Sequence, residues 1–244
     1  MTTIPQPLSL PVRQLPGRRY DRYFFGGMVV ALLLTAFAGF ARTYYLVGLT
    51  SAKLPATIVH VHAVLQTAWM LLLLVQMLLV SAKRVSLHRK LGIAGFLLAA
   101  AMVPVAVMLV ANELHRFASQ GDAALSFSLV PFWEISNFAV LAGSAFALRR
   151  YPVAHKRLII LATVAMMPAA ISRIPVPQVR QWTPWEVLAF VAAIAAYDIW
   201  SMRRIHAATL AGAGLIGAFL FGAFPLGNTA AWHVVAHWML SWNL

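Results

Sequence analysis

The chain has 244 residues, of which 61% are hydrophobic and 10% charged, and it contains no cysteine. Soluble domains carry roughly 25% charged residues, so the composition excludes a water-soluble fold, and the lack of cysteine excludes disulfides, iron–sulfur ligation and covalent haem attachment. The net charge of +13 is confined mainly to short turns between apolar segments, which indicates a membrane rather than a nucleic-acid partner.

Apolar segments long enough to cross a bilayer dominate the chain, since a spanning helix needs roughly 20 apolar residues. We predict spans at 24–48, 58–80, 92–112, 127–148, 157–172, 184–201 and 207–225. The predicted fold class is therefore all-α, a polytopic transmembrane bundle of seven helices plus a C-terminal interfacial helix. Residues 1–23 form a cytoplasmic tail, 24–226 the membrane domain and 227–244 an interfacial or partly inserted helix.

Basic residues predict the orientation. Fourteen of the 19 Lys and Arg residues lie in the N-terminal tail and in the turns at 83–90, 149–157 and 203–204. The others are Arg42, Lys53, Arg116, Arg173 and Arg180. The positive-inside rule places the first set in the cytoplasm, so we expect a bacterial inner-membrane protein with a cytoplasmic N terminus. The same turns are expected to contact anionic lipid headgroups of the bilayer.

Two of the basic turns are similar. Each has a basic start, then a histidine, two basic residues and a leucine, centred on His88 and His155. This similarity suggests repeated helical hairpins. Lipid-headgroup contact is the simpler interpretation of these histidines, and haem between their helices is the alternative.

Small residues and prolines predict where helices approach or bend. Gly212, Gly214, Gly217 and Gly222 in the last span would allow close helix contacts. Pro104, Pro168 and Pro225 would kink or end helices. Asn228 and Thr229 can cap a final helix that is too short to span the membrane.

Polar side chains at membrane depth are functional candidates because they are costly in hydrocarbon. His62, Gln66 and Trp69 share one face of the second span, whereas His60 points nearly the opposite way. His115 ends the third span, and Glu113 beside it can pair with Arg116.

The fourth and fifth spans supply the remaining candidates. Glu134 lies on a polar stripe of the fourth span, and Arg173 ends the fifth. His233 and His237 stand one turn apart in the tail but lack the glutamate of the metalloprotease motif. Asp198 is expected to pair with Arg203 or with a basic residue of a neighbouring turn.

Three chemistries are compatible with these residues. Imidazoles with a carboxylate can bind a divalent metal, and two imidazoles can ligate haem b. A metal-free Glu–Arg–His group can do acid–base chemistry or relay protons. Structural ion pairs such as Glu134–Arg173 are the alternative without function. The candidate residues are Glu134 and Arg173 for catalysis; His62, His115 and Gln66 for a cofactor; and His62, His115, Glu134, His233 and His237 for a metal.

Several motifs carry a resemblance. The runs from His60 through Gln66-Thr-Ala-Trp69 to Gln76, and from Leu87-His88-Arg89 to Gly92, resemble a widespread family of uncharacterised bacterial membrane proteins. That resemblance implies no activity. More distantly, the chain resembles the cytochrome b561 and ferric-reductase-like group, whose ligand histidines lie within spans in facing pairs. The fourth and sixth spans here have no histidine, which is a departure from that group.

The leading hypothesis is a histidine-ligated haem or divalent metal at the periplasmic helix ends, used in redox or metal handling. A non-enzymatic membrane subunit, scaffold or small transporter is one alternative. A metal-free or zinc-dependent intramembrane enzyme acting on a lipid-like substrate is the other. The sequence leaves open both the substrate and a homo- or hetero-oligomeric state.

Overall fold

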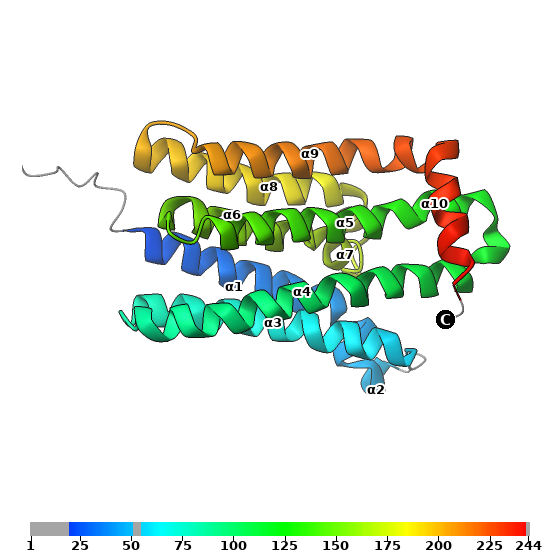
Figure 1. Ribbon diagram of the computed structural model, residues 1–244, viewed down its shortest axis with the longest axis horizontal. Coiled ribbons are helices and arrows are strands. Elements are labelled where there is room, and N and C mark those ends of the chain that lie inside the picture. The colour runs from blue at the N-terminus through cyan, green and yellow to red at the C-terminus, as the bar shows by residue number, and fades with distance from the viewer. Residues whose placement is uncertain (1–19, 51–54, 243–244) are drawn as a thin grey trace, which may run out of the picture.

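The computed structural model describes residues 20–50 and 55–242. Most of the predicted cytoplasmic tail lies outside this range, as does Lys53, one of the five basic residues not assigned to the cytoplasmic side. The described part is an all-α bundle without strands, in which seven helices are long and apolar enough to cross a membrane, as predicted (Figure 1).

The helix bounds extend the predicted spans by a few residues at most ends. The main helices are α1 (Asp21–Phe40), α3 (Thr57–Ser81), α4 (Val85–Arg116), α5 (Asp122–Ala147), α6 (Pro152–Ala165), α7 (Met167–Ile171), α8 (Pro177–Met202), α9 (Ala207–Gly227) and α10 (Ala230–Leu240). A π-helical turn, Ala41–Tyr45, continues α1 and is followed by the short α2 (Val47–Thr50). A 3₁₀ turn, Ala118–Gln120, connects α4 to α5.

The fifth span, made of α6 and α7, is the centre of the bundle. In its most apolar window 78% of the residues are buried, against 17 to 50% in the other six spans. The outer helices instead present bare apolar side chains such as Leu34, Leu71 and Phe221 to their surroundings. Because a water-soluble protein would not expose so many large apolar groups, this distribution fits a lipid environment.

Prolines break helices, and glycines make close helix contacts, at only some of the predicted positions. Pro168 coincides with the break between α6 and α7, as predicted, whereas Pro104 and Pro225 lie inside continuous helices. Gly212 packs against Leu161, and Gly222 against a tryptophan ring. Gly214 and Gly217, the other two glycines predicted to allow close helix contacts, have no described neighbour within 4 Å of the missing Cβ, so that part of the prediction was wrong.

The tightest glycine contacts lie elsewhere. A Cβ on Gly39 would collide with the backbone of Ala170, so α1 and α7 approach at this point as closely as two helices can. A Cβ on Gly227 would collide in the same way with Ser126, where the end of α9 meets α5.

The C-terminal helix α10 lies across the ends of α4 and α5 (Figure 1). Thr229 caps it, as predicted, by accepting a hydrogen bond from the backbone N–H of Trp232. Its buried residues, Trp232, Ala236 and Met239, form a second apolar core with Val110, Leu114 and Leu125 among others. This helix is therefore part of the folded bundle.

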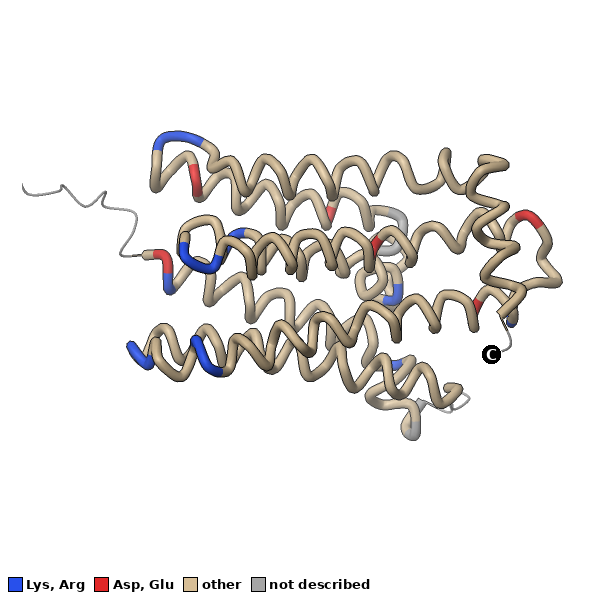
Figure 2. The backbone as a smooth tube through the Cα atoms, viewed as in Figure 1, with Lys and Arg blue, Asp and Glu red and all other residues tan. Residues whose placement is uncertain are grey.

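Charged residues separate along the bundle axis. The basic turns gather at the end where α1, α4, α6 and α9 begin, and most acidic residues lie deeper or at the opposite end (Figure 2). We call the first end, with the turns at 82–84, 148–151 and 203–206, the basic end.

Candidate functional site

Glu134 is the most unusual polar residue in the described bundle. It lies 12 residues into α5, about 18 Å along a helix that rises 1.5 Å per residue, and is only 8% exposed. This position is near the middle of α5, deeper than the outer end at which we expected it. Among the described residues it forms no hydrogen bond and no ion pair within 4 Å.

Arg173 supplies the opposing charge that acts on Glu134. It follows α7, donates a hydrogen bond to the carbonyl oxygen of Ala169 and lies over the Phe40 ring at 5.1 Å. The Arg173 side chain is exposed at the surface of the bundle, but neighbouring atoms exclude part of its solvent and so lower its pKa, an effect that the carboxylates of Glu134 and Glu113 oppose. The guanidinium stays protonated because arginine does not lose its proton in proteins. Glu134 and Arg173 therefore interact through space, and the predicted contact ion pair between them was wrong.

His62 belongs to the same electrostatic environment. The Arg173 charge acts on His62 as well as on Glu134. Trp69, two turns along the same α3 face, donates from Nε1 to Thr163 Oγ1 at 3.2 Å and meets the Phe138 ring edge-on at 5.1 Å. Phe138 is one turn from Glu134 on α5, so the predicted α3 face looks toward the Glu134 side of the bundle.

We call His62, Glu134 and Arg173 the buried acid site after Glu134, its one buried member; His62 is half-buried and Arg173 is exposed. Gln66 lies one turn from His62 on the same face, at the depth between His62 and Trp69. His60 takes no part, since its Nδ1 lies 3.2 Å from the hydroxyl of Tyr44. That His60 and His62 point apart stays a prediction.

His115 lies in a different region. Its Nδ1 is 2.8 Å from the carbonyl oxygen of Ala111, and its Nε2 is 3.0 Å from that of Leu240. Both ring nitrogens thus face acceptors, and the side chain connects α4 to the end of α10. Glu113 pairs with Arg116, as predicted.

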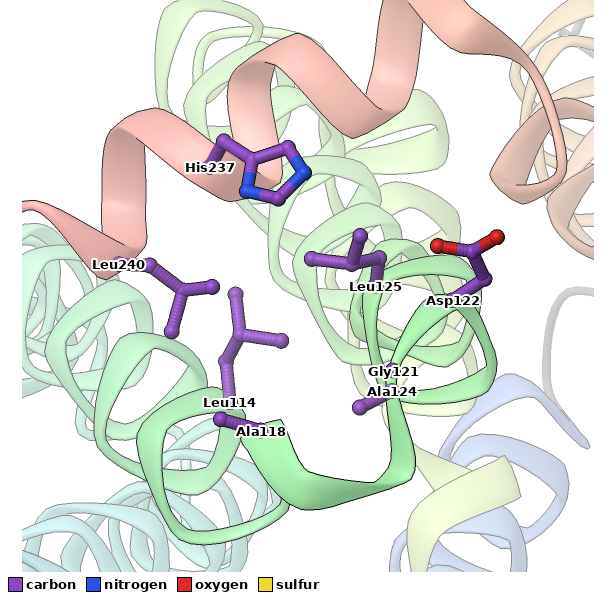
Figure 3. Close-up of a pocket in the computed structure, with 8 residues that line it drawn as sticks. All are labelled: Leu114, Ala118, Gly121, Asp122, Ala124, Leu125, His237 and Leu240. Carbon is purple, nitrogen blue, oxygen red and sulfur yellow. The ribbon is translucent and has the colours of Figure 1, made fainter.

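The tail histidines also have separate surroundings. His233 Nε2 lies 3.1 Å from the hydroxyl of Ser126. His237 lines a cavity of about 120 Å³ with Asp122 and mainly apolar neighbours (Figure 3). The two imidazoles thus meet different residues near the start of α5.

The predicted metal ligands are divided between two regions, the buried acid site (His62 and Glu134) and the α10 end (His115, His233 and His237). Within residues 20–50 and 55–242, no group of three His, Cys, Asp or Glu side chains is placed to hold a metal ion. Metal or haem ligation by single members of this set stays a prediction.

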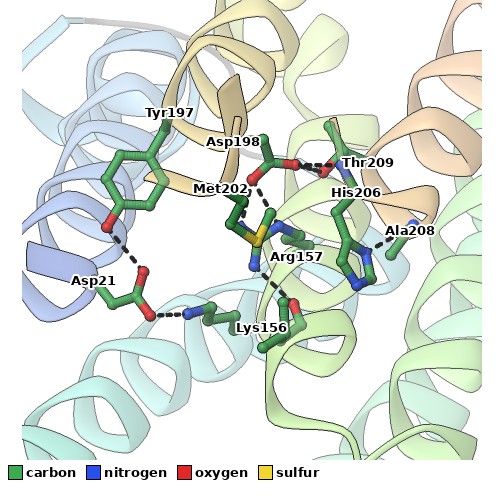
Figure 4. Close-up of polar contacts among 10 residues, drawn as sticks. Asp21, Lys156, Arg157, Tyr197, Asp198, Met202, His206, Ala208 and Thr209 are labelled. Atoms are coloured by element: carbon green, nitrogen blue, oxygen red, sulfur yellow. Dashed lines mark hydrogen bonds and ion pairs between the residues drawn. The ribbon is translucent and has the colours of Figure 1, made fainter. Parts of the chain in front are cut away.

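The most completely bonded polar group lies at the basic end. Arg157 and Asp198 are 1% and 0% exposed, and Arg157 donates from Nε to Asp198 Oδ1 at 2.8 Å and from Nη2 to the same oxygen (Figure 4). The other oxygen, Oδ2, accepts from the Thr209 hydroxyl at 2.6 Å and from the His206 backbone N–H at 3.0 Å. Asp198 therefore pairs with a basic residue of a neighbouring turn, one of the two predicted alternatives.

A second group beside it includes a residue that the sequence did not single out. Asp21, at the start of α1, pairs with Lys156 and accepts a hydrogen bond from Tyr197 at 2.8 Å. Both carboxylates at the basic end are thus neutralised by α6, the central helix. These groups join α1, α6, α8 and α9, which gives them a clear structural role.

Comparisons with known proteins add nothing to this geometry. No family model, no curated protein and no solved structure matches the chain.

Proposed function

We propose that the buried acid site is a proton-binding site within the membrane, used for acid–base chemistry or proton transfer. Glu134 would be the proton acceptor and donor. Arg173 would hold a negative charge in place, either the ionised carboxylate or an anionic substrate group. His62 would exchange protons with Glu134 or with the nearby surface.

The burial of Glu134 without a contacting partner is the observation that supports this proposal. A carboxylate in apolar surroundings is costly unless cations or hydrogen-bond donors surround it. Asp198, by contrast, has four donor contacts and fits a structural role. A polar group left unpaired at membrane depth is a functional candidate by default.

The expected haem b or divalent-metal site is the rival interpretation. We favour metal-free chemistry because both ring nitrogens of His115 face carbonyl oxygens. An optical spectrum and metal analysis of the detergent-solubilised protein distinguish the two. A Soret band or stoichiometric metal that disappears in His62→Ala would favour the rival.

We further propose an inner-membrane location with the basic end in the cytoplasm, on the strength of the positive-inside rule. Anionic headgroups would then surround the basic turns. Cysteine labelling at Ser119 from outside the membrane, and at Ser86 only after the membrane is opened, tests this orientation. The reverse pattern would overturn it.

Infrared spectroscopy tests the acid site directly. At neutral pH we expect a carboxylic-acid C=O stretch that shifts in D₂O and disappears in Glu134→Gln. Glu113→Gln is the matched control, because Glu113 is ion-paired with Arg116 and contributes no such band. No protonated-acid band in the native protein, or a band that survives Glu134→Gln, would contradict the proposal and favour the scaffold alternative.

A further inference from the structure

The two similar basic turns place their histidines against each other. His88 is the fourth residue of α4 and His155 the fourth residue of α6, so the hairpins α3–α4 and α5–α6 present them at equivalent positions. The ring centres are 6.4 Å apart and the ring planes nearly perpendicular, at 82°. Both side chains are half-buried at the basic end.

A hydrogen bond at Nδ1 sets the orientation and the tautomer of each imidazole ring. His155 Nδ1 lies 2.8 Å from the carbonyl oxygen of Ala145, which can only accept, so this nitrogen carries the hydrogen. The Gln76 amide is assigned the orientation in which its oxygen and its nitrogen both form hydrogen bonds. Its oxygen accepts from the Gly92 N–H at 3.0 Å, and its nitrogen donates to His88 Nδ1 at 2.7 Å. His88 Nδ1 is therefore an acceptor, and its hydrogen is on Nε2.

The Nε2 atoms are left available. In the described part of the chain neither Nε2 has a protein partner, and the two rings are not hydrogen-bonded to each other. Rings joined by a direct N–H···N bond of about 3 Å would have centres no more than roughly 5.5 Å apart. The observed ring-centre spacing of 6.4 Å exceeds that limit, so the two imidazoles do not satisfy each other.

The chemistry favours an anion as that ligand. His88 Nε2 carries a hydrogen, and a protonated nitrogen cannot ligate a metal. The nearest carboxylates, Asp21 and Asp198, are already bound to Lys156 and Arg157. No acidic group is thus left to supply the acceptor, whereas the charge of Arg89 reaches His88.

We propose that His88 and His155 form a phosphate-binding pair, which takes the phosphate of an anionic lipid headgroup or free phosphate at the basic end. His88 donates from Nε2, and His155 donates from Nε2 once that nitrogen is protonated. Binding is therefore tighter below the ordinary pKa range of histidine than above it. This site is independent of the buried acid site.

The charged groups around the pair are accounted for. On α4 and α6 they are Arg89, Lys90, Lys156 and Arg157; at the end of α5, Arg149, which donates to the Phe146 carbonyl oxygen; in the turn before α4, Lys83 and Arg84; on α1 and α8, Asp21 and Asp198. Arg150 in the turn before α6 and His206 in the turn before α9 complete the set. Lysine and arginine side chains in general keep their charge near neutral pH, so a pH dependence belongs to the imidazoles, and the His155 variant separates the pair from His206.

Calorimetry on the full-length protein in uncharged detergent tests the pair, with short-chain phosphatidylglycerol, short-chain phosphatidylcholine and inorganic phosphate as probes. We expect phosphatidylglycerol to bind about tenfold or more tightly at about pH 6 than at about pH 8. Its phosphodiester charge is the same at both values, so the change must come from the protein. Binding of phosphatidylglycerol alone identifies a headgroup site, and equal binding of inorganic phosphate identifies a free-phosphate site.

Two variants make the test specific. Asn in His155→Asn can still donate to the Ala145 carbonyl but has no Nε2, so we expect about a tenfold loss of affinity at about pH 6 and no pH dependence. His237→Gln, at the opposite end, is the matched control and should leave binding unchanged. No binding of either anion, equal binding of phosphatidylcholine, or unchanged binding in His155→Asn would overturn the proposal.

Discussion

Removal of the Asp198 carboxylate is the perturbation with the largest expected effect on stability. In Asp198→Ala, Arg157 keeps its bond to the Val153 carbonyl oxygen, at 2.9 Å, a weak contact with a methionine sulfur, and the Phe25 ring at 5.5 Å. Its charge remains 1% exposed with no counter-ion in contact. The hydroxyl of Thr209 and the backbone N–H of His206 also lose their acceptor.

The magnitude follows from the burial of the pair. Loss of one partner of a buried ion pair typically costs about 3–5 kcal/mol, because the other charge is left uncompensated. Replacing both partners by apolar residues is often close to neutral. We therefore expect Asp198→Ala to cost about 4 kcal/mol and the double variant Arg157→Leu/Asp198→Leu to recover most of that loss.

Reversible unfolding in mixed micelles, followed by circular dichroism, measures both free energies. Asp21→Ala is the matched control, because the Asp21–Lys156 pair is about a quarter exposed and should cost about 1 kcal/mol or less. The reasoning would be refuted if Asp198→Ala cost no more than Asp21→Ala, or if the double variant were as unstable as the single one.

Three further predictions concern packing, pH and the C-terminal helix. Gly39→Ala should lower the free energy of unfolding by about 1–3 kcal/mol, because the added methyl clashes with α7. Gly27→Ala is the control: nothing lies near its added methyl, so it should be neutral or slightly stabilising. Equal effects of the two variants in unfolding assays would argue against the close contact. Burial and the Arg157 charge lower the pKa of His206, whose Nδ1 accepts from the backbone and caps α9. The contribution of this cap to stability should therefore be complete above the histidine pKa of the unfolded chain and be lost as the pH falls through the lower pKa of the folded protein. In thermal unfolding, His206→Asn should flatten this pH profile, and an unchanged slope would contradict the prediction. Trp232→Phe removes hydrogen bonds to a carbonyl and a hydroxyl of α5, at a cost of about 1 kcal/mol each, so amide exchange of α10 should accelerate while that of α6 does not change.

Hydropathy predicted the seven spans well because the length of an apolar run depends on the local sequence alone. The helix cap at Thr229 and the Glu113–Arg116 pair were predictable for the same reason, since their partners are within one turn.

Contacts between distant helices could not be predicted in this way. Asp198 has several basic residues within reach of its helix end, and only the central position of α6 selects Arg157. Glu134 and Arg173 have opposite charges and were predicted as partners, but Arg173 instead donates a hydrogen bond to its own helix end and lies over the Phe40 ring. The Gln76–His88–His155 arrangement likewise depends on how two hairpins pack against each other. The two similar turns predicted repeated hairpins but did not predict this packing.

Unequal helix lengths have a consequence for the surrounding bilayer. The central span Pro152–Ile171 has 20 residues, about 30 Å, which matches a typical hydrocarbon thickness, whereas α4 has 32 residues, about 48 Å. A helix longer than the lipid is thick must tilt or stand out of it, at a modest free-energy cost for each ångström of mismatch. A thicker membrane would therefore submerge more of α4, α5 and the α10 end, and a thinner one would expose them. Bilayer thickness thus sets how much of the α10 end meets water.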